Sequence, residues 1–338
     1  MMNTINVRNT FTPSIAGKPD DTVSDLSDSD HLGVVPSVIP YIKPKLCVEV
    51  GDAVKVGTPL FSDKRRPTLL FTSPAGGTIA DITYGDRRVL NQIIIKRDTN
   101  EEYETFDSFT VESIKTKNRQ DIINVLLKGG LWGYIRSFPF RDIASDDVTP
   151  PSIYVTVDND EPFTPNSDLF MAEKEGIFEL GLEVLKKLSN DNVYVAVSNE
   201  NQHLKETLKG VTHTLKGAYP ANEPGVFHYY HKTNASENNA WYISAEHLLL
   251  VGQFINEGRV PTHQIISIGG PLASSPAHIK TRIGSPISHI LQNQTFKSDS
   301  LRFICGGIIT GRQSSVDGFL GYYESAVNVV KEGSEREF

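Results

Sequence analysis

A buried strand, a helix and a second strand in consecutive segments constrain the fold of this 338-residue chain most strongly. The run SIYVTV (152–157) is too continuous in β-branched residues for a half-exposed strand, so we expect it to be buried on both faces. NVYVAVS (192–198) reads as another strand. Between them lie apolar residues at helical spacing, namely Ile177, Leu180, Leu182, Val184, Leu185 and Leu188 in the segment 169–188. This order predicts a Rossmann-like parallel α/β domain, which we assign to residues 107–260.

Two more helices are expected in the same domain. A polar linker (101–120) precedes a helix over 120–128 that ends at Gly129-Gly130. A second helix over 244–256 is closed by Gly258.

Residues 46–96 form short runs of alternating valine and isoleucine separated by glycine turns, which is typical of a small all-β unit. The pattern V-E-V-G-D-x-V-K-x-G-x-x-L followed by S-P-x-x-G-x-I resembles the biotinyl and lipoyl carrier domains, so residues 1–106 are expected to hold a barrel-sandwich hybrid. In carrier domains of the lipoyl type the acylated lysine follows an aspartate at a hairpin tip, as Lys64 follows Asp63 here. The alternative is a solvated turn, since Arg65, Arg66 and Pro67 follow directly.

From His263 onward, short strands alternate with glycine turns and one helix, which is the order of a small β-grasp (SLBB-like) module. We assign this module and the charged tail to residues 261–338. The fold class is therefore α+β and α/β multidomain.

Charge and composition exclude several functions. A net charge of −8 argues against nucleic acid, which is bound by a surplus of Lys and Arg. No apolar run is long enough for a transmembrane helix, and the first thirty residues do not form a secretory signal, so a cytoplasmic location is expected. Two cysteines, Cys47 and Cys305, are too few for an iron–sulfur cluster or a cysteine-rich zinc site, and both are expected to be buried.

The loop KGGLWGYIRSFPFR (128–141) begins like a phosphate-binding turn and then becomes aromatic. A flat apolar ligand between rings, with an arginine near a carbonyl oxygen, suits it better than a pyrophosphate. The alternative is a loop packed between domains. The candidate ligand-binding residues are Trp132, Tyr134, Arg136, Phe138, Phe140 and Arg141.

Two further clusters have a functional and a structural interpretation. Asp158 and Glu161, in TVDNDEPF (156–163), end a buried strand, where ribose or metal contacts occur in α/β sheets; the same residues also make a good turn. His228 and His231 could face one metal on a helix, but Pro224 and Gly225 favour a loop with ordinary, partly buried histidines. We predict no metal site, and no hydrolytic triad or Walker loop is present.

Segments along the whole chain resemble one family. They are TPSIAGKP, VGDAVKVGTPLFSDKRRP, FTSPAGGTI, GLWGYIRSFPF, AWYISAEHLLLVGQFINEGRV and FLGYYESAVNVVKEGSEREF. Together they are similar, in order, to the NqrA family, whose members belong to the Na+-translocating NADH:quinone oxidoreductase (Na+-NQR). Members of that family usually continue in a further C-terminal region, so we expect this sequence to be a shortened form.

The resemblance extends to the flavin- and NADH-binding subunit of complex I and to the RnfC protein of the Rnf complex, which are distant relatives of the family. The complex I relative has G-L-R-G-R-G-G-A-G-F-P where this chain has GLWGYIRSF, and N-A-D-E-S-E-P where this chain has TVDNDEP. The resemblance therefore implies a vestigial nucleotide site that has lost flavin and NADH. Its remaining residues are Gly129, Gly130, Gly133, Asp158 and Glu161.

The function that the resemblance implies is that of a peripheral subunit on the cytoplasmic face of a bacterial inner membrane. Such a protein docks on the membrane-embedded NqrB protein and contributes to binding quinone or quinone-site inhibitors, while flavins and iron–sulfur centres belong to other subunits. No catalysis by this chain alone is expected. The alternative is an autonomous flavin- or NADH-binding oxidoreductase subunit of the Rnf or complex I type, and a third, weaker alternative is an acyl carrier.

Overall fold

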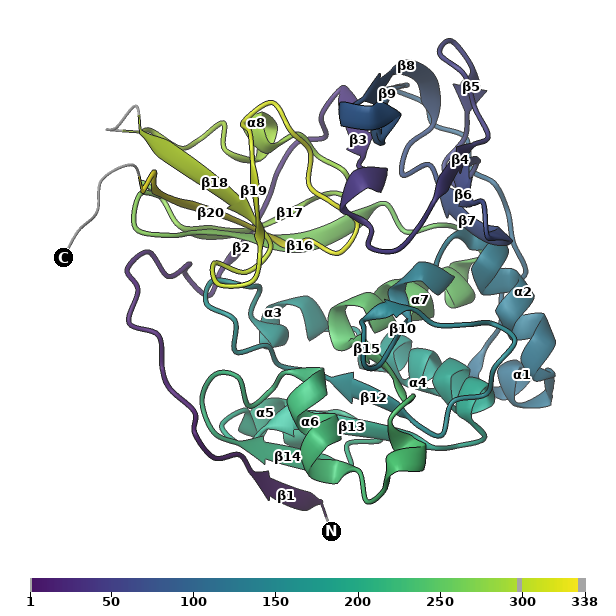
Figure 1. The fold of residues 1–338 in the computed structure, drawn as a ribbon, viewed down its shortest axis with the longest axis vertical. Helices are drawn as coiled ribbons and strands as arrows, with labels where there is room; N and C mark the ends of the chain where they lie inside the picture. The colour runs from purple at the N-terminus through teal and green to yellow at the C-terminus, as the bar shows by residue number, and fades with distance from the viewer. Residues whose placement is uncertain (1, 297–299, 334–338) are drawn as a thin grey trace.

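A computed structural model describes residues 2–296 and 300–333 of the chain. Figure 1 shows an α/β domain in the lower half, with a β-barrel and a second β-rich module side by side above it. The expected multidomain architecture is thus confirmed, and the three parts meet along shared surfaces that the sequence does not reveal.

The barrel-sandwich consists of two small antiparallel sheets. One has the order β3-β9-β8-β5 and the other β4-β6-β7. Phe61 and Phe71 stack with centroids 4.6 Å apart in the core of the barrel. The strands are β3 (His31–Val34), β4 (Pro44–Leu46), β5 (Ala53–Val54), β6 (Pro59–Asp63), β7 (Arg66–Thr72), β8 (Gly77–Tyr84) and β9 (Leu90–Arg97).

The central domain has a seven-stranded sheet of order β1-β14-β13-β12-β15-β10-β11. The first five strands in this order are parallel to one another. β10 pairs antiparallel with β15 on one side and with β11 on the other. The strands are β1 (Asn3–Asn6), β10 (Arg136–Ser137), β11 (Asp142–Ile143), β12 (Ile153–Thr156), β13 (Val193–Ser198), β14 (His213–Lys216) and β15 (Trp241–Ser244). The predicted buried strand is β12, which is buried at every position.

Helices cover both faces of this sheet (Figure 1). Helix α2 ends at Gly130, which has a left-handed φ of 78°, and α7 ends at Gly258 in the same conformation, as predicted. The helix expected over 169–188 is divided into α3 and α4. The helices are α1 (Val111–Thr116), α2 (Arg119–Gly129), α3 (Ser167–Met171), α4 (Glu175–Ser189), α5 (Gln202–Thr207), α6 (Pro224–His231) and α7 (Ala245–Glu257).

The C-terminal module is a six-stranded mixed sheet, of order β19-β18-β20-β16-β17-β2, that carries one short helix. β16 pairs antiparallel with β17 and parallel with β20, which is consistent with the expected β-grasp. Its elements are β2 (Val23–Asp25), β16 (His263–Gly269), β17 (Ala277–Arg282), α8 (Ile287–Ile290), β18 (Leu301–Cys305), β19 (Arg312–Ser314) and β20 (Ala326–Lys331).

Three local expectations differ from the structure. The N-terminal segment does not belong wholly to the barrel, because β1 pairs with β14 of the central sheet and β2 with β17 of the C-terminal sheet. Cys47 is exposed, because it lies just beyond the end of β4, whereas Cys305 is buried as expected. The segment around His228 is the helix α6 and not a loop, because Pro224 occupies the first turn, where its missing N–H is harmless.

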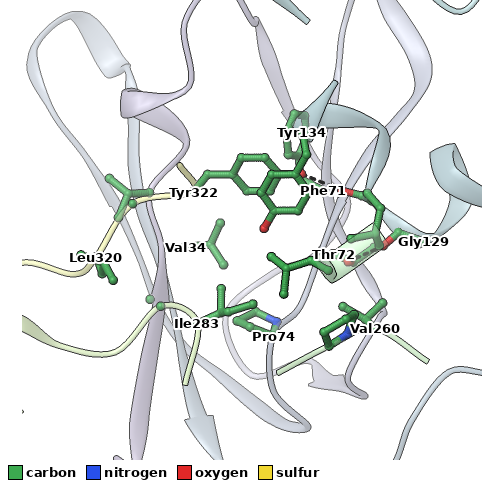
Figure 2. Close-up of a pocket in the computed structure, with 18 residues that line it drawn as sticks. Val34, Phe71, Thr72, Pro74, Gly129, Tyr134, Val260, Ile283, Leu320 and Tyr322 are labelled. Carbon is green, nitrogen blue, oxygen red and sulfur yellow. Dashed lines mark hydrogen bonds between the residues drawn. The ribbon is translucent and has the colours of Figure 1, made fainter. Parts of the chain in front are cut away.

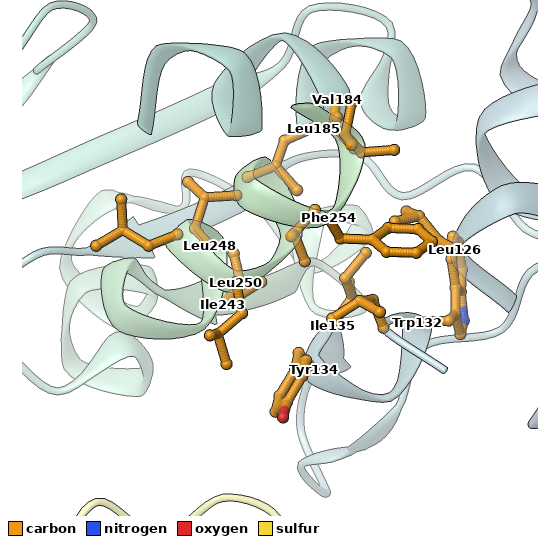
Figure 3. Close-up of a cluster of buried hydrophobic side chains, with 14 of the residues drawn as sticks. Leu126, Trp132, Tyr134, Ile135, Val184, Leu185, Ile243, Leu248, Leu250 and Phe254 are labelled. Atoms are coloured by element: carbon orange, nitrogen blue, oxygen red, sulfur yellow. The ribbon is translucent and has the colours of Figure 1, made fainter. Parts of the chain in front are cut away.

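Trp132 belongs to the core of the central domain. Its side chain is fully buried, donates from Nε1 to the carbonyl oxygen of Ala144 at 2.8 Å, and packs edge-on against Trp241 at 5.7 Å. Figure 3 shows it beside Leu126 and Phe254, within the cluster that joins α2, α4 and α7. The first candidate residue of the aromatic loop therefore stabilises the fold.

A buried ion cluster joins the barrel to the C-terminal module. The guanidinium of Arg282, on β17, donates to both carboxylate oxygens of Glu101 at 2.7 and 2.9 Å, to Asp28 at 3.2 Å and to the carbonyl oxygen of Pro74 at 2.9 Å. Its side chain is only 3% exposed. Both terminal nitrogens of the guanidinium are hydrogen-bonded, whereas its buried Nε has no partner. Removing one partner of a buried ion pair is costly.

We predict that Arg282→Met destabilises the protein by about 3–5 kcal/mol, because the buried carboxylate of Glu101 loses its bidentate partner and keeps only the longer pair with Arg97, at 3.5 Å. Lys280→Met on the same strand is the matched control, since its ion pair with Asp25 is exposed and long, at 4.0 Å. The control should change stability by about 0.5 kcal/mol or less. Chemical denaturation of both variants measures this, and equal effects would contradict the structural role of Arg282.

We also predict that Trp132→Ala destabilises the protein by about 3–5 kcal/mol through the cavity it leaves. Phe140→Ala, in the same loop, should change stability by about 0.5 kcal/mol or less, because that side chain is 72% exposed. Thermal or denaturant unfolding checks both variants. If Trp132→Ala lowers the free energy of unfolding no more than Phe140→Ala does, Trp132 is not part of the core.

Candidate functional site

A cleft of about 410 Å³ lies between the central domain and the C-terminal module, at the carboxyl ends of β12 and β15. From β12 the chain proceeds to β13 and β14 on one side, and then returns to β15 on the other side of β12. The cleft therefore lies at the point where the strand order reverses, which is where open α/β sheets bind ligands.

Aromatic rings form one wall of the cleft. Tyr134 is stacked between Tyr322, with centroids 4.3 Å apart, and His247, at 4.6 Å. The guanidinium of Arg136 lies over the ring of Tyr323 at 4.6 Å and over that of Tyr242 at 5.9 Å. The wall thus consists of aromatic rings packed on one another, with one cation over the rings of Tyr242 and Tyr323.

The two carboxylates of the supposed nucleotide site are used internally. Asp158 accepts hydrogen bonds from the backbone N–H of Ser198 at 2.6 Å and from the hydroxyl of Ser167 at 2.5 Å. Glu161 accepts from the backbone N–H groups of Ile309 at 2.5 Å and Thr310 at 3.1 Å, both in the C-terminal module. These carboxylates hold the loops of the cleft in place.

The turn that binds Glu161 requires glycine. A Cβ added to Gly307 would lie 1.8 Å from Cγ of Glu161, so any other residue would displace the carboxylate. At this turn the backbone of the C-terminal module therefore lies directly against the side chain of Glu161, at the edge of the central sheet.

The glycine loop is covered by hydroxyl groups from the other two parts of the chain. Thr72 donates to the carbonyl oxygen of Gly129 at 3.1 Å. Tyr322 donates to Gly130 at 2.8 Å, and Tyr323 donates to Gly133 at 2.7 Å. The front half of the loop thus packs between domains, which was the alternative to a ligand-binding loop in the sequence analysis.

A small apolar pocket of about 50 Å³ lies at this junction. Figure 2 shows Val34, Phe71, Ile283, Leu320 and Tyr322 around it, contributed by all three parts of the chain. Tyr134 lines both this pocket and the larger cleft.

Three buried polar atoms that line the larger cleft have no hydrogen-bond partner: Oε1 of Glu246, Oη of Tyr242 and Oδ1 of Asn222. Burial raises the pKa of Glu246 to about 7, against the opposing effects of Ser325 and Lys174. Burial lowers the pKa of the neighbouring His247 to about 3, so that imidazole is neutral. The residues that line the cleft therefore include hydrogen-bonding atoms without a partner in the protein and a carboxyl group whose pKa is raised by burial.

The structure divides the residues predicted for the aromatic loop into three groups. Tyr134, Arg136 and Arg141 line the cleft. Phe138 lies behind it, stacked between Tyr242 at 4.7 Å and His228 at 4.6 Å. Trp132 is in the core and Phe140 is exposed, as described above.

Sequence reasoning missed Tyr242 and Glu246, which lie in the segment WYISAEH (241–247). The available signal was their place at the carboxyl end of a short apolar strand, the kind of position that drew attention to Asp158. Asn222 and Tyr323 carried no comparable signal, because they reach the cleft only through tertiary packing.

The remaining candidates are in ordinary surroundings. His228 bonds to the carbonyl oxygen of Glu237 at 2.9 Å, and Nδ1 of His231 bonds to the hydroxyl of Tyr154 at 2.9 Å. Lys64 is exposed between β6 and β7, at the hairpin tip that the sequence predicted. Within residues 2–296 and 300–333, no group of three or more His, Cys, Asp or Glu side chains could hold a metal, and no helix is long and apolar enough to cross a membrane.

Three family models match successive parts of the chain. The NqrA N-terminal barrel-sandwich hybrid domain matches residues 5–98, the NqrA second alpha/beta domain matches 117–260, and the NQRA C-terminal domain matches 265–316. They coincide with the barrel, the α/β domain and the β-grasp module seen in the structure.

Among solved structures, an NAD+-reducing [NiFe]-hydrogenase in the air-oxidized state shows a partial likeness. The TM-score is 0.43 and the identity 12%, over 69% of this chain and 52% of that chain. This level of similarity carries no argument about function.

Curated relatives match over nearly the whole chain. The Na(+)-translocating NADH-quinone reductase NqrA protein of Saccharophagus degradans is 30% identical over 336 residues, which are 99% of this chain and 75% of that protein. The protein of the same name from Vibrio campbellii is 29% identical, over 98% of this chain and 74% of that protein. By these matches, the chain belongs to the NqrA family of Na+-translocating NADH-quinone reductase subunits.

Proposed function

We propose that this chain is a peripheral subunit of the sodium-translocating reductase, and that it binds a quinone, or an inhibitor of the quinone site, in the cleft between the central domain and the C-terminal module. One observation carries the proposal. The cleft combines stacked aromatic rings with buried hydrogen-bonding atoms that no protein group satisfies.

The chemistry of a quinone matches these features. Its ring is flat and apolar, and its two carbonyl oxygens accept hydrogen bonds. Tyr323 and Tyr242 supply aromatic rings beside the guanidinium of Arg136, and the hydroxyl of Tyr242 is a donor without a partner. The volume of about 410 Å³ is within the range of about 300–1,000 Å³ that is usual for small-molecule sites.

Charge favours a neutral ligand over a nucleotide. The side chains around the cleft include more carboxylates than guanidinium groups: Asp158, Glu161, Glu223, Glu246 and Glu324 against Arg136, Arg141 and Arg312. Arg141 pairs with Glu223 at 3.0 Å, and Arg312 pairs with Glu324 at 2.7 Å, so two of the three cations are already neutralised. A pyrophosphate would meet net negative charge and a glycine loop covered by hydroxyl groups.

In this proposal the chain binds no flavin or iron–sulfur centre tightly, and electrons pass through cofactors of other subunits. Docking on the membrane-embedded NqrB protein, at the cytoplasmic face of the membrane, is part of the same proposal. Its support is membership of a family whose relatives are named as one component of a larger reductase.

We predict that Tyr242→Phe weakens quinone binding without harming the fold. The ring is retained and the lost hydroxyl has no partner in the protein, so stability should not fall. The ligand loses one hydrogen bond, which is worth about 0.5–1.5 kcal/mol, or about two- to tenfold in affinity. Calorimetric titration with duroquinone measures this; its fully substituted ring does not add to the exposed thiol of Cys47.

Tyr229→Phe is the matched control, since that side chain is 69% exposed on α6. It should bind duroquinone as the unmodified chain does. Equal affinities of both variants and the unmodified chain would contradict binding at Tyr242.

The second candidate, an autonomous flavin- or NADH-binding protein, predicts a different result. We expect the purified chain to be colourless, and titration with FMN or NADH to give no saturable binding, because of the charge excess described above. A bound yellow chromophore, or stoichiometric nucleotide binding, would favour the second candidate instead.

A further inference from the structure

The carboxyl group of Glu246 has an unusual position in the cleft. Glu246 is the second residue of α7, directly after the carboxyl end of β15, and its Oε1 is buried without a hydrogen-bond partner. Four residues earlier, Tyr242 is 7% exposed, with an equally unpartnered hydroxyl, and Asn222 is 2% exposed, with an unpartnered amide oxygen. Buried polar groups in native proteins nearly always have a partner, so three unpartnered atoms in residues that line one cleft require an explanation.

Glu246 differs from the other carboxylates that line the cleft. Asp158 and Glu161 are held by backbone N–H groups, while Glu223 and Glu324 pair with arginines. Glu246 has no ion-pair partner within 4.0 Å among the described residues, and the nearby side chain of Ser325 lowers its pKa. Among the described residues that line the cleft, Glu246 is therefore the carboxyl group that is neither paired with an arginine nor held by backbone N–H groups.

We propose that Glu246 recognises the oxidation state of the bound ring by exchanging a hydrogen bond with a ring oxygen. In its protonated form it donates to the carbonyl oxygen of a quinone. In its ionised form it accepts from the hydroxyl group of the corresponding hydroquinone. This inference rests on the proposed quinone-binding function of the cleft and adds the residue that discriminates between the two redox forms.

The surroundings of Glu246 allow both protonation states. Burial disfavours the ionised form, and Ser325 and the distant charge of Lys174 favour it. From the other elements, Tyr134 of the aromatic loop and Arg136 of β10 face the same cleft, with Tyr323 from the segment before β20. His247, the next residue of α7, stays neutral above about pH 3, so it adds no charge near neutral pH. With the pKa of Glu246 at about 7, either form is accessible without large cost.

Opposite pH dependences follow for the two ligands. The apparent Kd is the intrinsic Kd divided by the fraction of protein in the binding-competent state. For a carboxyl group with a pKa of about 7, as for Glu246, the protonated fraction falls from roughly nine-tenths at about pH 6 to roughly one-tenth at about pH 8. Quinone affinity should therefore fall about tenfold over this interval, and hydroquinone affinity should rise about tenfold.

The experiment is a calorimetric titration of the 338-residue chain with duroquinone and with anaerobic durohydroquinone across this pH range. Glu246→Gln keeps the size of the side chain and removes its titration, so both slopes should vanish. Glu257→Gln is the matched control, because Glu257 is exposed at the other end of the same helix. It should retain both slopes.

A second measurement does not depend on comparing variants. Titrations in two buffers of different ionisation enthalpy report the protons exchanged on binding. Near neutral pH, quinone binding should take up a fraction of a proton, and hydroquinone binding should release a fraction of a proton.

The results separate the two levels of the proposal. If both rings bind but their affinities do not change with pH, or if the slopes persist in Glu246→Gln, the role of Glu246 is overturned while the cleft remains a quinone site. If neither ring binds at any pH, the quinone-binding proposal fails, and the role of Glu246 fails with it.

Discussion

The contact between Glu161 and the glycine turn of the C-terminal module is the interaction on which the site depends. Two backbone N–H groups and the hydroxyl of Thr310 bind this buried carboxylate, and Gly307 leaves it no room for displacement. The contact brings the module onto the carboxyl edge of the central sheet. Together with the bonds of Tyr322 and Tyr323 to the glycine loop, it places the module over the strand-order reversal at β12 and β15.

The residues that we predicted to be remnants of a nucleotide site thus have structural tasks here. Asp158 and Glu161 hold loops, and the glycine loop receives hydroxyl groups from Thr72, Tyr322 and Tyr323. The cleft that remains has excess negative charge and aromatic walls, which supports the proposed change of ligand from a phosphate-bearing nucleotide to a neutral ring. The polar atoms left without partners come from other segments: Tyr242 of β15, Glu246 of α7, and Asn222 before α6.

Local features of the fold could be predicted from the sequence, because they are set by neighbouring residues. The buried strand β12 and the glycine ends of α2 and α7 are examples. The pairing of β1 and β2 with distant sheets was not predicted, since a strand of three or four residues carries no signal for its partner. The prediction for Cys47 was wrong for a similar reason: burial at a strand end depends on what packs there, not on the apolar run around it.

The candidate site was predicted only in part. Tyr134, Arg136 and Arg141 were identified from the aromatic loop, whereas Asn222, Tyr242, Glu246 and Tyr323 reach the cleft from separate segments of the chain. The most direct test of the account is a crystal structure with a bromine-labelled quinone, located by anomalous scattering. The account predicts a bromine peak in the cleft beside Tyr242 and Tyr323. A peak elsewhere, for example at the apolar pocket of Figure 2, or no peak at full saturation, would contradict it.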